Sequence, residues 1–360
     1  MTFLVRDPGG WRERAHRLAA AATHPKPPGD YLDLFAPLRR GADLRARVLE
    51  VSPEPGGAVT VVLRPGRGWR GHVPGQYLRV GLDVDGVRLW RSYSITSRPG
   101  APEVTITAKP VPDGTVSLHL AQELRSGQLV HLEQALGDFV LPDPAPAKVL
   151  FVTGGSGITP VIGMLRSGLD RLRDVVLVHS EGNADDVLFG EELRDLAAAG
   201  RIRLVEQHTD AAGRLDPATL AALVPDLAER ETWACGPTGL LDALEAQWAT
   251  EGRAHLLHTE RFRVSLVEPG DGGTVRFSTA DGVTEVAADG ATPILDAGEA
   301  AGVLMPSGCR MGICYSCVLP MREGAVRDLR SGDVTTAAPG DNVLIQTCVS
   351  AAAGTCDLDL

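Results

Sequence analysis

The segment Ser307-Gly308-Cys309-Arg310-Met311-Gly312-Ile313-Cys314-Tyr315-Ser316-Cys317 places three cysteines in the pattern C-x4-C-x2-C, and Cys348 follows after thirty intervening residues. The chain has 360 residues and six cysteines, of which five lie after residue 300 while Cys235 stands alone. A secreted protein held by disulfides would spread its cysteines along the chain. The clustering therefore predicts metal chemistry in the C-terminal part.

This spacing is that of a plant-type [2Fe–2S] centre. Two irons bridged by sulfides need four thiolates, and three of them must come from one tight loop. Gly308 and Gly312 suit such a loop because glycine tolerates a positive φ. A four-cysteine zinc site is the alternative, but zinc usually takes two short C-x2-C-like pairs. Cys356 fits no ligand spacing and is expected to be a buried small residue. The predicted ligands are Cys309, Cys314, Cys317 and Cys348.

Composition limits the classes of function. The net charge is −11 and there is no basic tract, which argues against non-specific nucleic-acid binding. No run of eighteen apolar residues predicts a transmembrane helix. Charged residues interrupt the N-terminus too early for a signal peptide. We expect a cytoplasmic monomer that meets a membrane only through a partner.

Changes in sequence pattern predict the division of the chain. Short β-branched runs such as 59–63 alternate with Gly and Pro clusters, which favours an antiparallel β-barrel. Later apolar runs such as 149–152 alternate with helical segments, which favours a parallel α/β sheet. The predicted units are an N-terminal arm (1–42) whose Tyr31, Leu34 and Phe35 pack on the body, a β-barrel (43–146), an α/β domain (147–251), a linker (252–272) and a third unit (273–360).

The α/β unit begins with Thr153-Gly154-Gly155-Ser156-Gly157-Ile158-Thr159-Pro160. Thr159 is a good N-cap and Pro160 suits the first helical position. The glycines would let backbone amides approach a pyrophosphate at a helix N-terminus. A second strand ends at Cys235-Gly236-Pro237, at the edge of the sheet where ligands of open α/β sheets bind. A buried cysteine before a turn is the alternative interpretation.

Arg91-Ser92-Tyr93-Ser94 lies in the β-rich part. An arginine, an aromatic ring and a serine at this spacing could bind a phosphate, stack on a flat ring and hydrogen-bond to it. Taken alone, Tyr93 also fits a half-buried strand residue.

The order of the motifs resembles the ferredoxin–NADP⁺ reductase superfamily fused to a C-terminal ferredoxin domain, over residues 43–360. The sequence shows R-x-Y-S, then Gly114-Thr115-Val116-Ser117, the glycine-rich loop, Cys-Gly-Pro and the cysteine pattern. Details such as Leu344-Ile345-Gln346-Thr347-Cys348 are most similar to actinobacterial reductases of acyl-CoA desaturases. Reductases of ketosteroid hydroxylases and phenylacetyl-CoA epoxidases share the domain order. The resemblance implies a flavin barrel, a nicotinamide α/β domain and an α+β ferredoxin domain of the β-grasp type.

The resemblance also implies roles for individual residues. Arg91 would contact the flavin phosphate, Tyr93 would stack on the isoalloxazine, and Ser94 would bond near its reactive nitrogen. Cys235 would lie by the nicotinamide and Glu260 at the flavin, so the implied catalytic set is Tyr93, Ser94, Cys235 and Glu260. The other implied cofactor-binding residues are Thr107, Lys109, Gly114, Val116, Ser117, Gly154, Gly155, Ser156, Gly157, Thr159, Ser180, Arg214, Gly236, Pro237 and Phe262.

The preferred nicotinamide stays open. Many NADPH-preferring members carry an arginine after the second α/β strand, where this chain has His179-Ser180-Glu181-Gly182-Asn183. Glu181 would repel a 2′-phosphate and could bond a ribose hydroxyl, whereas Arg214 and Ser180 could bind phosphate. The resemblance favours FAD over FMN.

The expected activity is hydride transfer from NAD(P)H to the flavin, followed by single-electron transfer through the cluster to a partner protein. A fatty acyl desaturase is the favoured acceptor, and a Rieske or steroid hydroxylase or a cytochrome P450 is the alternative. A nicotinamide-responsive redox sensor and a zinc-bearing binding module are hypotheses of other classes.

Overall fold

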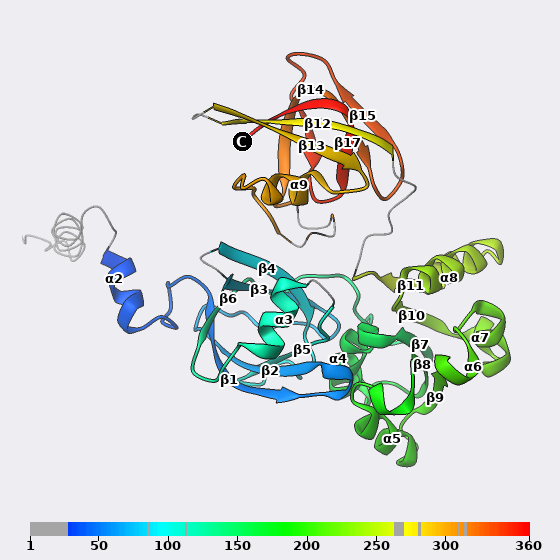
Figure 1. Ribbon diagram of the computed structural model, residues 1–360. Coiled ribbons are helices and arrows are strands. Elements are labelled where there is room, and N and C mark those ends of the chain that lie inside the picture. Colours follow the sequence, from blue (N-terminus) through cyan, green and yellow to red (C-terminus); the bar gives the residue numbers. More distant parts are fainter. Residues whose placement is uncertain are drawn as a thin grey trace, which may run out of the picture.

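The computed structural model describes residues 28–84, 87–111, 114–262, 270–279, 282–308, 310, 312 and 315–360. Three sheets organise these residues, and in Figure 1 the C-terminal unit lies above the other two. Among the described residues, no helix has the length and apolarity that a membrane span requires.

The first sheet is antiparallel, with strand order β4-β3-β6-β1-β2-β5. A bridge between Ile95 and Ile106 joins the end of β4 to β5, which brings the two outer strands together. Alternate residues such as Val59, Val61 and Leu63 fill the interior. This confirms the predicted flavin-type barrel. Its elements are β1 (Arg45–Pro53), a 3-10 turn (Pro55–Gly57), β2 (Val59–Pro65), β3 (Tyr77–Val84), β4 (Val87–Ser94), β5 (Val104–Ala108), α3 (Thr115–Gln122) and β6 (Leu129–Leu132).

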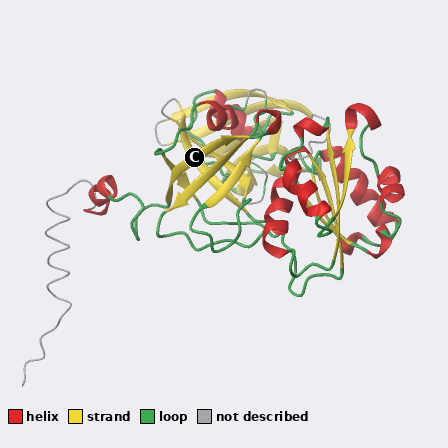
Figure 2. Ribbon diagram, turned by 90° about the horizontal axis from the view of Figure 1, so that it is seen from below, coloured by secondary structure: helices red, strands yellow, loops and turns green. Residues whose placement is uncertain are grey.

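The second sheet is parallel, with strand order β11-β10-β7-β8-β9. Helices cover both of its faces (Figure 2). Successive residues of β7 point to opposite faces, so Phe151 packs in one apolar cluster and Val152 in the other. The strands are β7 (Lys148–Gly154), β8 (Asp174–Glu181), β9 (Arg203–His208), β10 (Glu231–Cys235) and β11 (Leu257–Glu260). The α-helices are α4 (Ile158–Gly168), α5 (Gly190–Ala198), α6 (Thr209–Ala212), α7 (Pro217–Leu223) and α8 (Thr238–Thr250).

Two local expectations in this unit are wrong. Helix α4 begins at Ile158 after a 3-10 turn over Gly155–Gly157, so Thr159 lies inside the helix and its hydroxyl donates to the Ser156 carbonyl. The N-cap pattern started the helix at Pro160, whereas the packed helix also includes Ile158 and Thr159, both of which are buried. Strand β11 lies within 252–272, the segment expected to be a linker, and it pairs with β10 as a fifth parallel strand.

The third sheet has the order β13-β12-β17-β14-β15, with β16 paired to β14. Strands β12 and β17 are parallel, whereas the other pairs are antiparallel. Helix α9 packs on this sheet through Ile294 and Leu295, which confirms the α+β fold. Cys356 is fully buried, as expected. The elements are β12 (Gly270–Thr279), β13 (Gly282–Gly290), α9 (Ile294–Ala300), β14 (Val318–Asp328), β15 (Val334–Ala337), β16 (Val343–Gln346) and β17 (Ser350–Asp359).

The described part of the arm includes α2 (Pro28–Phe35). Leu34 and Phe35 are 75% and 89% exposed, and Tyr31 is 43% exposed. The expectation that these side chains pack on the body is therefore wrong, because the helix projects away from the barrel (Figure 1).

Candidate active site

A cavity of about 1120 Å³ lies where the barrel, the α/β unit and the C-terminal unit meet. It collects most of the residues singled out from the sequence, although they come from distant segments. Those lining it are Arg91, Tyr93, Ser94, Thr107, Lys109, Gly114, Val116, Ser117, Gly154, Gly155, Ser156, Gly157, Thr159, Gly236, Pro237, Glu260 and Phe262. These elements adjoin because Ile95, just after β4, contacts Gly163 of α4, and Lys109, just after β5, pairs with Glu181 at the end of β8.

Strand β4 supplies one wall through Arg91, Tyr93 and Ser94. Ser94 is buried, and its Oγ has no hydrogen-bond partner among the described residues. Burial raises the pKa of the half-buried Tyr93, which keeps its phenol neutral. Burial also lowers the pKa of Arg91, and its Nη1 donates to the Trp90 carbonyl at 2.8 Å. A buried unpaired hydroxyl facing a cavity normally requires a partner, so this wall fits a flat, polar-edged ligand such as flavin.

The start of α3 forms the next part of the wall. Gly114 precedes the helix, and a Cβ there would lie 2.5 Å from Val111 Cγ2 and 2.6 Å from Ser117 Oγ. The Ser117 hydroxyl donates to the Gly114 carbonyl at 3.0 Å. This close turn directs the first amides of an eight-residue helix toward the cavity, an arrangement that favours a pyrophosphate.

Lys109 and Thr107 are both engaged within the protein. Lys109 Nζ lies 3.2 Å from Glu181 Oε2, so it forms an ion pair between the barrel and the α/β unit. The Thr107 hydroxyl is 2.7 Å from that of Thr60. Lys109 therefore reaches toward the end of β8 as well as lining the cavity.

The glycine-rich loop packs backbone against backbone on the β10–α8 turn. A Cβ on Gly157 would lie 2.0 Å from the Cys235 carbonyl oxygen, and one on Gly154 would lie 2.6 Å from Pro237 Cδ. Gly155 has a φ of +55°, which favours glycine. Strands β7 and β10 are neighbours although β8 and β9 separate them in the chain, so the loop lies at a topological switch point, where such sheets bind ligands.

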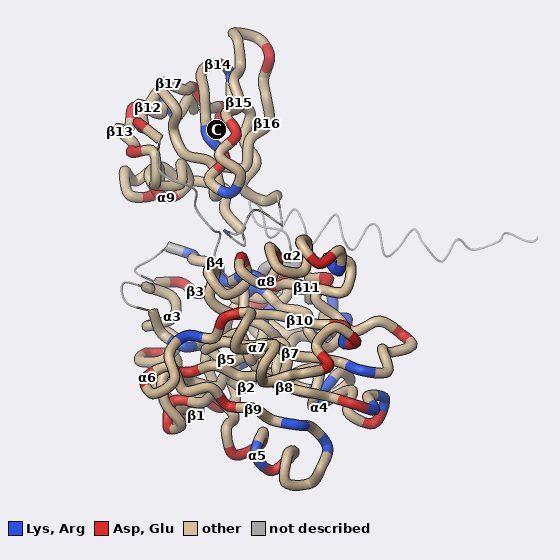
Figure 3. Tube along the Cα trace, turned by 90° about the vertical axis from the view of Figure 1, so that its right-hand side faces the viewer, with Lys and Arg blue, Asp and Glu red and all other residues tan. Residues whose placement is uncertain are grey.

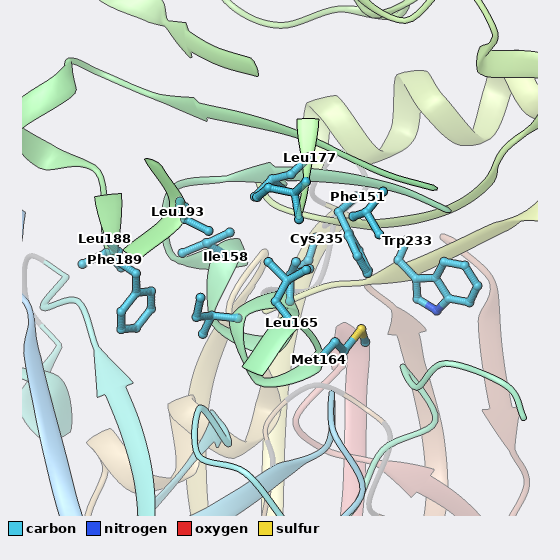
Figure 4. Packing of buried hydrophobic residues seen from close by; sticks show 14 of the residues in the cluster. Phe151, Ile158, Met164, Leu165, Leu177, Leu188, Phe189, Leu193, Trp233 and Cys235 are labelled. Carbon is cyan, nitrogen blue, oxygen red and sulfur yellow. The ribbon is translucent and has the colours of Figure 1, made fainter. Parts of the chain in front are cut away.

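Cys235 and Glu260 are neighbours in the β10–β11 register. Burial raises the pKa of the Glu260 carboxyl to about 8, with Asp138 adding to the effect. In the part of the chain that the structure describes, the shielded Oε2 of Glu260 has no hydrogen-bond partner. Burial also raises the pKa of the Cys235 thiol, and the negative charge that Glu260 can carry raises it further. Both groups are therefore protonated near neutral pH. Glu260 lines the cavity, whereas Cys235 lies behind the wall among Phe151, Ile158 and Trp233 (Figure 4).

Ser180 and Arg214 do not line this cavity. Ser180 is buried at the end of β8, and Arg214 is exposed after Gly213. Glu181, which follows Ser180 at the end of β8, accepts from Lys109 and from the Gly182 amide.

The structure describes two of the four predicted cluster ligands, Cys317 and Cys348, and both are buried. Cys309 and Cys314 lie outside the described residues. Thr347 holds the two ligand segments together, because its amide and hydroxyl donate to the Cys317 carbonyl at 3.2 and 2.9 Å. The segments that bear Cys317 and Cys348 therefore lie side by side, and two buried cysteines in adjacent segments fit a shared cluster.

Sequence reasoning missed Arg330, which lines the cavity from the C-terminal unit. Its Nη1 donates to the Gly312 carbonyl at 3.4 Å, and its Nη2 donates to Asp328 and Gln346. Gly312 has the expected positive φ, +74°, and a Cβ there would meet Arg330 at 2.5 Å. Arg310, which lies between the first two cysteines of the pattern, pairs with Asp296 and Glu299, the acidic residues of α9 (Figure 3). No local pattern around Arg330 signals its role.

Comparison with known proteins gives the same three units. Models of an oxidoreductase FAD-binding domain, an oxidoreductase NAD-binding domain and a 2Fe-2S iron-sulfur cluster binding domain match residues 69–141, 151–246 and 278–353. An NADPH oxidoreductase of Mycobacterium tuberculosis is 48% identical, over 98% of this chain and 93% of its own length. The ferredoxin reductase component of a 3-ketosteroid-9-alpha-monooxygenase of Mycolicibacterium smegmatis is 31% identical, over 76% of this chain and 83% of its own.

Among solved structures, phthalate dioxygenase reductase matches the fold with a TM-score of 0.63, over 88% of this chain and 97% of its own, at 22% identity. The matched domains bind FAD, a nicotinamide dinucleotide and a [2Fe–2S] cluster, the three groups that the cavity and the cysteines fit. The chain belongs to the family of NAD(P)H-dependent oxidoreductases that join FAD-binding, NAD-binding and 2Fe-2S domains in one polypeptide.

Proposed function

We propose that this chain is the reductase of a fatty acyl desaturase, and that it delivers electrons from NAD(P)H one at a time through the cluster at Cys309, Cys314, Cys317 and Cys348. The observation that carries the internal route is the single cavity shared by β4, the glycine-rich loop and Arg330. The acceptor rests on the resemblance of the cluster loop and of residues 344–348 to desaturase reductases.

A bound flavin accepts a hydride and releases single electrons, which a [2Fe–2S] centre requires. The protein would hold and orient it. Arg91 would bind its phosphate end, the Tyr93 ring would stack on the ring system, and the Ser94 hydroxyl would complete its hydrogen bonds there. The amides at the start of α3 would bind the pyrophosphate. These roles use groups that already face the cavity.

Across the cavity, the glycine-rich loop would bind the nicotinamide dinucleotide. Glu260 would keep a proton on its carboxyl and donate it in a hydrogen bond into the cavity, because burial raises its pKa to about 8. Cys235 supports this wall from behind as a neutral thiol. Hydride transfer then needs placement rather than a general base.

The test is a reconstituted assay with three acceptors, namely a membrane-bound acyl desaturase, the oxygenase of a ketosteroid hydroxylase, and a cytochrome P450. Each is run with NADPH and separately with NADH. We expect the reductase to support turnover of the desaturase at least about tenfold faster than turnover of the other two acceptors, a ratio that corresponds to roughly 1.4 kcal/mol. Turnover by the hydroxylase or P450 alone would reject the proposed acceptor.

A control separates the acceptor from the internal route. Cys348→Ser should reduce ferricyanide at the wild-type rate, because that reaction uses the flavin, yet fail with every protein acceptor. If Cys348→Ser still supplied a protein acceptor, the cluster would not be the exit.

A further inference from the structure

Arg79 on β3 is a buried arginine whose two arms point to different units. Its side chain is 2% exposed. Nη1 donates to Glu133 Oε2 at 2.7 Å, and the guanidinium carbon lies 5.2 Å from the centre of the Trp90 ring. Nη2 donates to the carbonyl oxygen of Ser307 at 3.3 Å. Ser307 belongs to the C-terminal unit, so Arg79 joins the barrel to the unit that bears the cysteines.

A buried guanidinium is costly unless it is paired and hydrogen-bonded. Glu133 supplies the opposite charge and Trp90 covers one face of the guanidinium. The planar fork fixes the direction of the second arm once the first is bound. The barrel therefore presents a preset donor to the Ser307 carbonyl rather than a mobile side chain.

The two ends of this contact lie beside the two sites between which electrons would pass, the cysteine loop and the wall of the flavin cavity. Ser307 lies two residues before the predicted ligand Cys309. Arg79 pairs across the sheet with Ser92 and lies two residues from Tyr77 on the same strand face. Tyr77 and Ser92 both line the flavin cavity. Arg79 thus lies between the cavity wall and the start of the cysteine loop.

Two further contacts hold the same loop at Gly312. Arg330 lines the cavity and donates to the carbonyl of Gly312, which lies within the C-x4-C segment. Gln346 Nε2 donates to that carbonyl as well, at 2.9 Å. Arg330 and Gln346 belong to the C-terminal unit itself, whereas Arg79 contacts this region from the barrel.

We propose that Arg79 is a positioning residue that holds the cysteine loop against the flavin cavity and thereby sets the rate at which electrons pass from flavin to cluster. This rests on the proposed internal route. Electron transfer slows steeply as donor and acceptor separate, so a loop that detaches part of the time transfers more slowly. A hydrogen bond from a charged donor is strong enough that its loss should lower the docked population about tenfold.

The experiment compares wild type, Arg79→Met and the control Arg88→Met in the full chain with its cofactors. Arg88 pairs with Asp83 in the same β3–β4 hairpin at 2.8 Å, and its side chain is 44% exposed. Hydrogen–deuterium exchange is measured over residues 303–308. Stopped-flow mixing with NADPH follows flavin reduction and cluster reduction separately.

In Arg79→Met, residues 303–308 should exchange about tenfold faster than in wild type, and the cluster should be reduced about tenfold more slowly. Flavin reduction should stay within about twofold of wild type. Arg88→Met should match wild type.

The outcomes separate this inference from the proposed route. Wild type that reduces its flavin but never its cluster would reject the route itself. If wild type reduces its cluster, but Arg79→Met shows the same exchange and the same rate of cluster reduction, only the role of Arg79 is overturned.

If Arg79→Met does not fold, Arg79→Lys decides, because lysine keeps the charge beside Glu133 but loses the planar fork. Faster exchange and slower cluster reduction in Arg79→Lys support the inference, and wild-type behaviour overturns it.

Discussion

The barrel meets its two neighbours through different kinds of contact. On the α/β unit, helix α4 packs directly on the barrel backbone, so that a Cβ on Gly163 would lie 2.5 Å from the Ile95 carbonyl oxygen. Arg166 of the same helix donates to the Thr96 carbonyl at 2.8 Å. On the C-terminal unit, the long side chain of Arg79 reaches the Ser307 carbonyl.

This difference matches the two transfers that we propose. A hydride moves only between atoms in near contact, so the first junction must hold its position within a fraction of an ångström. Single electrons tolerate a gap, so a junction made by side chains is sufficient at the cluster. The comparison predicts that small changes at the first junction impair the reaction with nicotinamide, whereas changes at the second impair only electron exit.

The largest expected effect isolates the second transfer. Cys317→Ser removes a predicted ligand from a buried position, so the cluster should be lost and delivery to a protein acceptor should fall by roughly a hundredfold or more. Ferricyanide reduction should stay within about twofold of wild type. Visible spectra and both activities are measured on the same preparation.

Cys356→Ser is the matched control, because Cys356 is buried in the same unit but is not a predicted ligand. It should keep the cluster absorption while losing about 1–3 kcal/mol of stability through the buried hydroxyl. Loss of the cluster in Cys356→Ser alone would reverse the ligand assignment.

A methyl group at Gly163 should disturb the first junction. Gly163→Ala forces α4 away from the Ile95 carbonyl, which should cost about 1–3 kcal/mol of unfolding free energy and slow flavin reduction by NADPH about tenfold or more. Gly168→Ala lies in the same helix, where its Cβ would meet Leu141 at an ordinary 3.9 Å. That control should stabilise the protein by up to about 1 kcal/mol. Equal effects of the two changes would show that the helix backbone, not the junction, is responsible.

The Glu260 carboxyl should make stability depend on pH. Its pKa is 4.5 ordinarily and about 8 in the folded protein. Between these values the folded chain holds a proton that the unfolded chain has lost, so stability is greatest at low pH and falls as pH rises toward 8. The slope should be about 1.4 kcal/mol per pH unit, measured by denaturant unfolding at pH 5.5, 6.5 and 7.5.

Glu260→Gln should remove this slope. Glu245→Gln is the control, since Glu245 lines the same cavity but is substantially exposed and pairs with Arg261. It should leave the slope as in wild type. An unchanged slope in Glu260→Gln would mean that another group carries the pH dependence.

Sequence patterns predicted the parts of the site whose chemistry demands particular residues in a short segment. The glycine-rich loop and R-x-Y-S are of this kind, and both line the cavity. Arg79 was missed because its partner Ser307 lies 228 residues away and meets it only where two units dock. Arg330 was missed because only the docking of the units brings it to the cavity. Strand β11 was missed because four residues without an apolar run become a strand only beside β10.

The smallest expected effect concerns the ion pair between Lys109 and Glu181, which spans the first junction at 3.2 Å. Glu181 partly cancels the charge of Lys109 at the end of β8, where a dinucleotide ribose binds in sheets of this kind. Glu181→Gln leaves the Lys109 charge unopposed, so the ratio of kcat/KM for NADPH to that for NADH should rise. Because both side chains are partly exposed, the interaction is worth about 1 kcal/mol and the ratio should change about fivefold.

Lys109→Met should lower the same ratio, and 0.5 M salt should shrink both changes by screening. Equal ratios in all three proteins would show that the 2′-phosphate binds elsewhere, and the two variants would then report only on how firmly the barrel is joined to the α/β unit.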